Sequence, residues 1–464
     1  MSQEQILSGL QQIVGDDKVK TDADSLETFG KDWTKIYPPK PLAIVFPAST
    51  DEVAAIVKLA NELSFALVPS GGRTGLSAGA VAANGEVVVA LDRMNSLTDF
   101  NAIDRTVRCG AGVITEQLQD YAVEQGLYYP VDFASAGSSQ VGGNIGTNAG
   151  GIKVIKYGMT RDWVAGLKVV TGKGDVLELN KDLVKNNTGY DLRQLFIGGE
   201  GTLGFVTEAT MRLDRAPKNL NVLVLGVPEL EAIMNVLHAF QNKIDLTAFE
   251  FFSDKAMRKV LARGDVPAPF ETQAEYYALI EFEAENDAIV DAAMEVFEYC
   301  MEQGWVLDGV ISQSETQAKN LWRLREDISE TIAEWTPYKN DISVVVSKVP
   351  PFLNEIEQVV NKEYPDFEII WFGHIGDGNL HLNILKPENL DKESFFEKCA
   401  IVSKWVFEIV EKYHGSVSAE HGVGMTKKPY LEYTRSAVEI EYMRAMKRVF
   451  DPNNVMNPGK IIDL

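Results

Sequence analysis

Three glycine-rich segments in the first half of the chain constrain its fold more than any other feature. They are PSGGRTG at 69–75, QVGGNIGTNAGGIKVIKYG at 140–158 and GGEGTLG at 198–204. Glycine lets the backbone pass close to a ligand and turn its N–H groups toward an anion. One such segment alone is more often a simple tight turn, but three in one domain predict a pyrophosphate-binding site.

The residues before the first glycine segment predict a β-α-β unit. LAIVF at 42–46 has a strand pattern, Ser49 and Glu52 form an S-x-x-E box that begins a helix, and FALVP at 65–69 is a second strand. The first glycine loop therefore follows the carboxyl end of a strand, where open α/β sheets bind ligands. Short strands rich in β-branched residues follow, so we expect an α+β domain over residues 1–215.

The third glycine segment matches the dinucleotide-binding pattern G-x-G-x-x-G at 199–204. In a Rossmann fold this pattern opens a helix. Here it leads into FVTEATMRL, whose β-branched residues predict a strand instead. We therefore expect no nicotinamide site at this segment.

Glycine becomes sparse after about residue 216, and strand-like and helical stretches alternate instead. Examples are YYALIEFEA at 276–284 and DAAMEVFEYCMEQG at 291–304. We expect a second α+β domain over 216–425, with antiparallel strands and long helices that form a cap. A C-terminal segment at 426–464 is expected to return to the first domain, and its apolar spacing predicts a helix from Ser436 to Val449.

Composition excludes several classes of protein. The 464 residues include 44 Lys and Arg against 67 Asp and Glu, and the formal charge of -23 disfavours nucleic acid and anionic membranes as partners. No apolar run reaches the roughly 18 residues of a membrane-spanning helix, and no secretory leader pattern is present, so we expect a cytoplasmic protein. The scattered cysteines, Cys109, Cys300 and Cys399, predict reduced thiols rather than an iron–sulfur cluster.

The segment FGHIGDGNLHLNI at 372–384 predicts a hairpin with a two-residue type I′ turn at Asp377-Gly378. Counting outward from that turn pairs His374 with His381, so that two ring nitrogens can converge on one metal ion. Strand alternation places Asn383 on the same face as His381. A candidate third ligand, Glu420, lies in SAEHGVG at 418–424, and such a ligand set leaves coordination positions open.

Other interpretations of these residues stay open. Paired histidines at a hairpin can be ordinary surface residues, and His238 and His414 are expected to be plain helix residues. The segment at 321–344, which includes Arg325 and Lys339, is by itself an amphipathic helix with a solvated charged face. A guanidinium there could also hold a carboxylate in a bidentate manner.

Several motifs together resemble one known family. PSGGRTG, GGNIGTNAGG, YGMTRDWV, GTLGFVTE and the closing NPGK resemble the flavin domain of the vanillyl-alcohol-oxidase type, specifically its D-2-hydroxyacid dehydrogenase branch, and the resemblance covers nearly the whole chain. It implies an α+β fold, with a two-subdomain FAD-binding domain and an α+β cap domain on an antiparallel sheet. No histidine precedes His238, so we expect FAD without a covalent link. The cofactor-binding residues implied are Pro69, Ser70, Gly71, Gly72, Arg73, Thr74, Gly75, Ser138, Gly142, Gly143, Asn144, Thr147, Asn148, Gly151, Glu200, Gly201, Val206 and Asn457.

The same resemblance assigns the histidine-rich motifs. GHIGDGNLHLN and AEHG are similar to the family's metal motifs, which implies His374, His381 and Glu420 as ligands and His421 as catalytic base. Zinc is the metal usually implied, and cobalt or manganese also suits these ligands. The substrate-binding positions of D-2-hydroxyglutarate dehydrogenases correspond here to Arg325, Ser329, Lys339, Asn383 and His421. Many relatives have Thr where Ser329 stands, which leaves the preferred chain length of the substrate open.

The resemblance thus implies oxidation of D-2-hydroxyglutarate, and of D-malate as a further substrate, to the 2-oxo acid. A hydride would pass from the substrate Cα to flavin N5. The electrons would go to an external acceptor such as electron-transfer flavoprotein or a quinone, and a homodimer is expected. The alternatives are a D-lactate or glycolate dehydrogenase of the same family, a non-haem iron oxygenase, and a metal-buffering or scaffold protein without activity.

Overall fold

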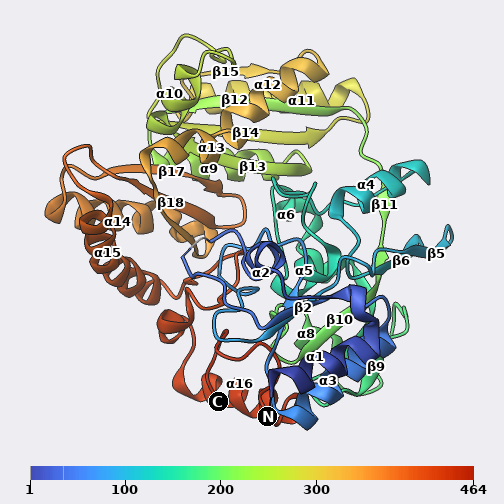
Figure 1. Cartoon of the computed structure of the whole chain (residues 1–464). Helices are drawn as coiled ribbons and strands as arrows, with labels where there is room; N and C mark the ends of the chain where they lie inside the picture. The colour runs from blue at the N-terminus through green and yellow to red at the C-terminus, as the bar shows by residue number, and fades with distance from the viewer. Residues whose placement is uncertain (1, 35) are drawn as a thin grey trace. The chain divides into compact units, whose positions relative to one another are not determined.

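In the computed structural model, which describes residues 2–34 and 36–464, the chain divides into two units (Figure 1). The first consists of Met1–Gly151, Gly158–Ala216 and Glu420–Leu464, and the second of Ile152–Tyr157 and Pro217–Ala419. Two features differ from the predicted ranges. A short piece of the second glycine segment belongs to the second unit, and the chain returns to the first unit at Glu420 rather than at 426. The functional division into domains remains a prediction.

The β-α-β segment near the start of the chain is present as β2 (Ala43–Val45), α3 (Thr50–Leu63) and β3 (Leu67–Ser70). Strands β2 and β3 each pair in parallel with β4 (Val87–Ala90), in a sheet of order β1-β2-β4-β3. Helix α3 begins where Ser49 Oγ accepts the N–H of Glu52, as the sequence predicts. Its buried residues recur at helical spacing and pack on the sheet, so the strand that ends at the first glycine loop is firmly supported.

A second sheet in the first unit is antiparallel and has the order β5-β6-β10-β8-β9. GGEGTLG leads directly into its central strand β10 (Gly204–Arg212), which confirms the predicted strand after that glycine segment. The remaining elements of the unit are α1 (Gln3–Val14), β1 (Val19–Lys20), α2 (Ala23–Phe29), β5 (Leu97–Asn101), β6 (Thr106–Gly110), α4 (Thr115–Glu124), β7 (Leu127–Tyr128), α5 (Val141–Thr147), α7 (Thr160–Trp163), β8 (Val164–Thr171), β9 (Val176–Leu179), α8 (Arg193–Phe196), β11 (Asp214–Arg215) and α16 (Ala437–Phe450).

The C-terminal segment reaches the first glycine loop from the side. Helix α16 is preceded by the N-cap residue Ser436, which forms a capping box with Glu439. The buried Asp451 after the helix accepts the N–H groups of Val455 and Met456. The N–H of Asn457 then donates to Leu67 O at 2.8 Å. The NPGK motif therefore lies beside β3, the strand that leads into PSGGRTG.

The second unit is built on one antiparallel sheet of seven strands, in the order β15-β12-β14-β13-β17-β18-β16 (Figure 1). One face packs against α10, α12 and α13 through a large apolar cluster, and on the opposite face Phe297 of α11 packs on Leu225 while α14 reaches Trp371. The elements of the unit are α6 (Val154–Tyr157), β12 (Leu220–Val227), α9 (Leu230–Gln241), β13 (Leu246–Ser253), α10 (Asp254–Ala262), β14 (Tyr276–Glu283), α11 (Asp287–Glu302), β15 (Asp308–Ile311), α12 (Glu315–Glu326), α13 (Ile328–Thr331), β16 (Tyr338–Ser343), α14 (Val349–Glu363), β17 (Glu368–His374), β18 (Asn379–Leu385) and α15 (Lys392–Lys412).

Candidate functional site

In the first unit, two of the glycine segments contain positions with no room for a Cβ atom. A Cβ atom at Gly72 would lie 2.2 Å from Ser138 O, and one at Gly142 would lie 2.6 Å from the Cβ of Ala111. Larger residues would force these loops apart. The glycines at 72 and 142 are therefore required by packing. A Cβ at Gly143, by contrast, would meet no atom of the described residues within 4 Å beyond its chain neighbours and the backbone of its own helix.

Four of the predicted cofactor residues have a left-handed backbone although none is glycine. They are Arg73, Asn148, Glu200 and Asn457, with φ of 60°, 52°, 47° and 43°. Such conformations are strained for residues with a side chain and gather at ligand-binding sites. Their presence in all three glycine segments and in the NPGK motif marks one region of the first unit as built for a ligand.

Two buried acceptor atoms in this region fit a ligand that donates hydrogen bonds. Gln140 Oε1 and Asn457 Oδ1 have no hydrogen-bond partner among the described residues, although Gln140 is 5% exposed and Asn457 only 1%. Buried oxygens without a donor are costly. The hydroxyl and N–H groups of FAD are donors of the kind these oxygens lack, so the residues present fit the cofactor that the sequence predicts.

Other predicted cofactor side chains are already committed to the protein. The Arg73 guanidinium forms a bidentate ion pair with Asp92, at 2.8 Å and 3.1 Å, and stacks over the ring of Phe29. Asn144 Nδ2 donates to Thr115 Oγ1, and Thr147 Oγ1 donates to the carbonyl of Gly143. These side chains shape the loops, so they offer a cofactor mainly their backbone.

Glu200 anchors the returning C-terminal segment. Its carboxylate accepts the N–H groups of Val423 and Gly424 at 2.6 Å and 2.8 Å, and its carbonyl accepts from Asn457 Nδ2. Burial raises the pKa of Glu200 to about 7, and the two backbone donors only partly offset this effect. The loop held in this way carries the predicted base His421 two residues before Val423.

Glu420 lies in the same anchored loop, next to His421. Its Oε2 accepts the N–H of Gly151 at 3.0 Å, which ties the end of the second glycine segment to the loop. Glu420 is also the first residue of the first unit after Ala419, the last residue of the second. The predicted metal ligand thus sits at the point where the chain passes from one unit to the other.

In the second unit, the two histidines of the hairpin come together, but not in the predicted register. His374 lies opposite Asn379, and His381 opposite Phe372. The turn spans four residues rather than two, because Ile375 is fully buried and the N–H of Gly376 donates to Phe249 O on β13. The predicted type I′ turn and direct His374–His381 pairing are therefore wrong.

The error in register leaves the face of each histidine unchanged. A shift by an even number of residues keeps every side chain on its side of the sheet. The rings of His374 and His381 are diagonal neighbours with centroids 5.3 Å apart, and each ring offers a nitrogen within 4.8 Å of one on the other. Two imidazoles at this separation can share one metal ion.

Each of the two histidines faces a buried carboxylate that the sequence analysis missed. His374 Nδ1 donates to Glu250 Oε1 at 2.7 Å, and His381 Nδ1 lies 3.8 Å from Asp341 Oδ1. Asp341 is held in turn by Asn379 and by the N–H of Ala419. Metal-binding histidines commonly present one nitrogen to such a partner and the other to the metal. The arrangement therefore fits a metal site.

The predicted substrate residues of the second unit lie on the same face of the sheet as the histidines. Lys339 on β16 is opposite Asn383 on β18, and Asp341 is opposite His381. Lys339 Nζ donates to Ser329 Oγ at 2.9 Å. The buried Arg325 stacks over Phe372, the residue opposite His381, with its Cζ 4.7 Å from the ring centre. The charged groups of Lys339 and Arg325 and the amide group of Asn383 therefore lie on the same side of the sheet as the two imidazoles.

Strand register brings these partners together from distant parts of the chain, which is why sequence reasoning missed two of them. Glu250 is separated from His374 by 124 residues. Its only local signal is a single acidic residue inside the apolar strand LTAFEFFS, whereas Asp341 lies in the mostly polar strand YKNDIS and gives no such signal. A charged residue in an otherwise buried strand needs a partner, but the sequence of the strand does not show which residue that partner is.

His238 is an exposed residue of α9, as the sequence predicts. His414 was also predicted to be a helix residue, but it lies after the end of α15 at Lys412, with a left-handed φ of 55°. Cys109, Cys300 and Cys399 are all free and buried. Among the residues that the structure describes, no helix is long and apolar enough to cross a bilayer.

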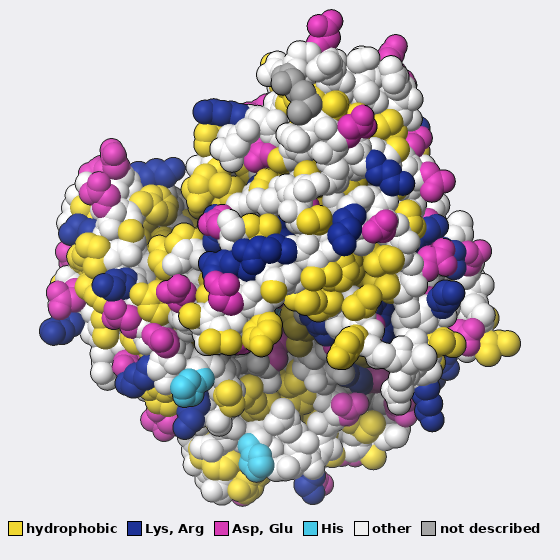
Figure 2. All heavy atoms as spheres, turned by 90° about the horizontal axis from the view of Figure 1, so that it is seen from below, with side chains coloured by type: hydrophobic (Ala, Val, Ile, Leu, Met, Phe, Trp, Pro, Cys, Tyr) yellow, Lys and Arg dark blue, Asp and Glu magenta, His cyan; other side chains and the backbone are white. Residues whose placement is uncertain are grey.

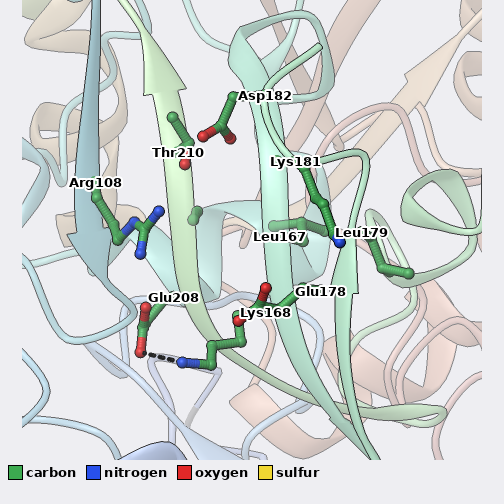
Figure 3. Close-up of a pocket in the computed structure, with 11 residues that line it drawn as sticks. Arg108, Leu167, Lys168, Glu178, Leu179, Lys181, Asp182, Glu208 and Thr210 are labelled. Carbon is green, nitrogen blue, oxygen red and sulfur yellow. Dashed lines mark hydrogen bonds and ion pairs between the residues drawn. The ribbon is translucent and has the colours of Figure 1, made fainter. Parts of the chain in front are cut away.

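A separate pocket on the five-stranded sheet of the first unit contains none of the predicted site residues (Figure 3). Its lining carries charges of both signs, and Lys168 and Glu208 pair across it at 3.2 Å. On the face shown in Figure 2, basic and acidic side chains are also interspersed. Neither view reveals a single-sign patch that would attract a polyanion.

Comparisons with known proteins found family models that match most of the chain and relatives that match it over nearly its full length. A family model described as "FAD binding domain" matches residues 41–180, and one described as "FAD linked oxidases, C-terminal domain" matches residues 216–461. A D-2-hydroxyglutarate dehydrogenase of Stutzerimonas stutzeri is 70% identical over 461 residues, which cover 99% of each chain. A D-2-hydroxyglutarate dehydrogenase of Xanthomonas citri is 54% identical and covers 100% of this chain and 98% of its own.

Solved structures share the fold at low identity. A p-cresol methylhydroxylase with bound substrate superimposes with a TM-score of 0.76 at 17% identity, over 99% of this chain and 97% of that one. An alkyldihydroxyacetonephosphate synthase gives a TM-score of 0.74 at 18% identity. These likenesses concern the fold alone, and with the family models they confirm the predicted α+β flavin fold.

Proposed function

Because this chain belongs to the family of D-2-hydroxyglutarate dehydrogenases, which are FAD-dependent hydroxyacid dehydrogenases, we propose that it oxidises D-2-hydroxyglutarate, and also D-malate, with the help of a divalent metal ion. The observation that carries the proposal is the set of polar side chains on one face of the sheet in the second unit. There the paired imidazoles of His374 and His381 share a sheet face with Lys339 and Asn383. A ligand with two carboxylates and a hydroxyl group matches this combination of groups.

The glycine segments of the first unit would hold FAD. Backbone N–H groups of 69–75 and 138–151 would bind its pyrophosphate, and the unpartnered oxygens of Gln140 and Asn457 would accept hydrogen bonds from its donor groups. When bound, FAD supplies an acceptor for the hydride that leaves the substrate Cα. Arg73 and Glu200 act by holding their loops in place.

His374, His381 and Glu420 would hold the metal, for which zinc is the first choice. The N–H of Ala419, the residue that precedes Glu420 in the chain, donates to Asp341 at 3.1 Å. When bound, the ion supplies a Lewis acid that lowers the pKa of the substrate hydroxyl group. Glu250 orients the imidazole of His374 through a hydrogen bond, and Asp341 lies beside the imidazole of His381.

The remaining residues bind and deprotonate the substrate. His421 removes the hydroxyl proton as general base, held in place by the neighbouring contacts of the loop to Glu200. Arg325 and Lys339 bind the carboxylates, with Ser329 positioning the ammonium group of Lys339. Asn383 contributes an amide from the same face of the sheet.

Electrons must then leave the enzyme, and we propose electron-transfer flavoprotein or a quinone as the acceptor. The chain's three cysteines are buried single thiols, which cannot hold a cluster of their own. We also propose that FAD is bound without a covalent link, that the protein forms a homodimer and that it is located in the cytoplasm.

The test is anaerobic mixing of the purified protein with D- and L-2-hydroxy acids while the flavin absorbance is followed, before and after chelation of metal. The proposal expects rapid bleaching with D-2-hydroxyglutarate, slower bleaching with D-malate, and loss of both after chelation. Bleaching by D-lactate or glycolate at an equal or higher rate would favour the alternative dehydrogenase. Bleaching that is unchanged after complete metal removal would contradict the metal dependence.

A further inference from the structure

Glu250 is a buried carboxylate shared by two groups of the proposed site. It lies on β13 and is 1% exposed. Its Oε1 accepts from His374 Nδ1 at 2.7 Å, and its Oε2 lies 2.9 Å from Arg325 Nε. One side chain therefore contacts both a histidine of the proposed metal site and the arginine of the proposed substrate site.

We propose that Glu250 is a positioning residue that couples metal binding to recognition of the substrate carboxylate. This inference rests on the proposed function, in which His374 is a metal ligand and Arg325 binds substrate. It goes beyond that function because it makes the two roles dependent on a single carboxylate.

The effect on His374 follows from its two ring nitrogens. Because Glu250 accepts a hydrogen bond from Nδ1, the neutral ring carries its proton there and keeps Nε2 unprotonated for a metal ion. The register of β13 and β17 supports this contact, since Phe252 lies opposite Phe372 and continuation by two residues brings Glu250 opposite His374. The carboxylate is thus built into the sheet rather than carried by a loop.

The effect on Arg325 concerns the direction of its guanidinium group. The ion pair with Glu250 uses Nε, and the ring of Phe372 supports the flat face of the group. The terminal nitrogens then keep the planar arrangement that binds a carboxylate in a bidentate manner. Without Glu250, a buried arginine would lose the charge that fixes its orientation.

A second buried glutamate on the same face of the sheet provides a matched control. Glu281 on β14 is 3% exposed and binds Lys153, Thr247 and Trp322 at 2.6–2.9 Å. It contacts neither His374 nor Arg325. A substitution at Glu281 therefore removes a comparable buried charge without touching the proposed metal and substrate groups.

The experiment compares Glu250→Gln and Glu250→Asp with Glu281→Gln in the FAD-loaded protein. Zinc affinity is measured after metal removal by competition with a chromophoric chelator, and kcat and KM are measured with D-2-hydroxyglutarate. Glutamine matches the shape and can still accept from His374, but it carries no charge for the ion pair with Arg325. Glu250→Gln should weaken zinc binding about 10–100-fold and raise KM by a similar factor. The shorter side chain of Glu250→Asp keeps the charge but should lose one contact, so it should impair one property more than the other.

Glu281→Gln should lower thermal stability but leave zinc affinity within about twofold of the wild type. If both Glu250 variants kept the zinc affinity and KM of the wild type, this inference would be overturned while the proposed function would stand. Wild-type protein that binds zinc no more tightly than His381→Ala would instead overturn the proposed metal site, and this inference with it. An equal loss of zinc affinity in the Glu281 variant would show a general effect of a damaged core and would also overturn the coupling.

Discussion

The two units prepare their binding groups in different ways. In the first unit, the cofactor region consists of glycines and left-handed residues, and side chains such as Arg73 and Asn144 are already paired within the protein. In the second unit, the two candidate histidines are side chains on neighbouring strands, and each faces a carboxylate from another strand. A backbone site depends on local conformation, whereas a side-chain site depends on the register of the sheet. Substitutions should therefore affect the two units differently.

The largest effect should come from the histidine pair. His374→Ala should abolish tight zinc binding and lower kcat by about 10⁴-fold, because several kcal/mol of Lewis-acid stabilisation would be lost. The FAD content should stay at the wild-type level, since the substitution lies in the other unit. Metal analysis and flavin absorbance of the same sample check this. Loss of FAD together with the metal would show that the two sites are not independent.

The next prediction concerns His421, the proposed general base in the loop that begins at Glu420. His421→Ala should slow flavin reduction by D-2-hydroxyglutarate about 10²–10⁴-fold, the usual range for a lost general base. Stopped-flow absorbance gives the rate, and zinc and FAD content serve as controls because neither should change. An unaltered reduction rate would assign the proton transfer to another group.

Substrate charge is tested at Lys339 on the face of the sheet. Lys339→Ala should lower kcat/KM for D-2-hydroxyglutarate about 10–100-fold, because a hydrogen bond to a charged group is worth roughly 1.5–3 kcal/mol. The rate with D-lactate, which has a single carboxylate, should change much less. Equal losses with both substrates would mean that Lys339 does not bind the second carboxylate.

The backbone site is tested by adding one methyl group at Gly143. Beyond its own helix, no atom of the described residues lies within 4 Å of a Cβ built there, so Gly143→Ala should not destabilise the FAD-free protein toward thermal unfolding. If FAD occupies that space, crowding should weaken its binding about tenfold, which corresponds to about 1.4 kcal/mol. Titration of the FAD-free protein with FAD measures the affinity. At Gly72, by contrast, alanine should damage the fold itself, because its Cβ would lie 2.2 Å from Ser138 O.

The last prediction concerns the pH dependence of stability due to Glu200, which changes neither the metal site nor the catalytic groups. Its pKa is raised to about 7 by burial, whereas an exposed glutamate has a value near 4.5. Between these values the unfolded chain loses a proton that the folded chain keeps, so this group makes the protein less stable as the pH rises from about 4.5 to about 7. The thermal midpoint of the wild type relative to Glu200→Gln should therefore be a few degrees higher at pH 5 than at pH 8. A difference that is independent of pH would contradict the raised pKa.

Much of the fold was predictable because its signals are local. The Ser49 cap, the strand after GGEGTLG and the helix after Ser436 depend on residues a few positions apart, and the structure confirms all three. The hairpin turn at Asp377-Gly378 was predicted in the same manner and is wrong. Burial of Ile375 and the hydrogen bond from Gly376 to β13 favour a four-residue turn, and both are tertiary contacts.

By itself, the sequence determined the glycine loops, the two-histidine motif and the faces on which the strand residues lie. These depend on backbone freedom at glycine and on the alternation of side chains, which remain the same under a register shift of two residues. Only the tertiary structure decided that Glu250 bridges His374 and Arg325, and that Glu200 holds the loop after His421. Those contacts join residues far apart in the chain, and their formation depends on how strands pair and loops return, which no local pattern specifies.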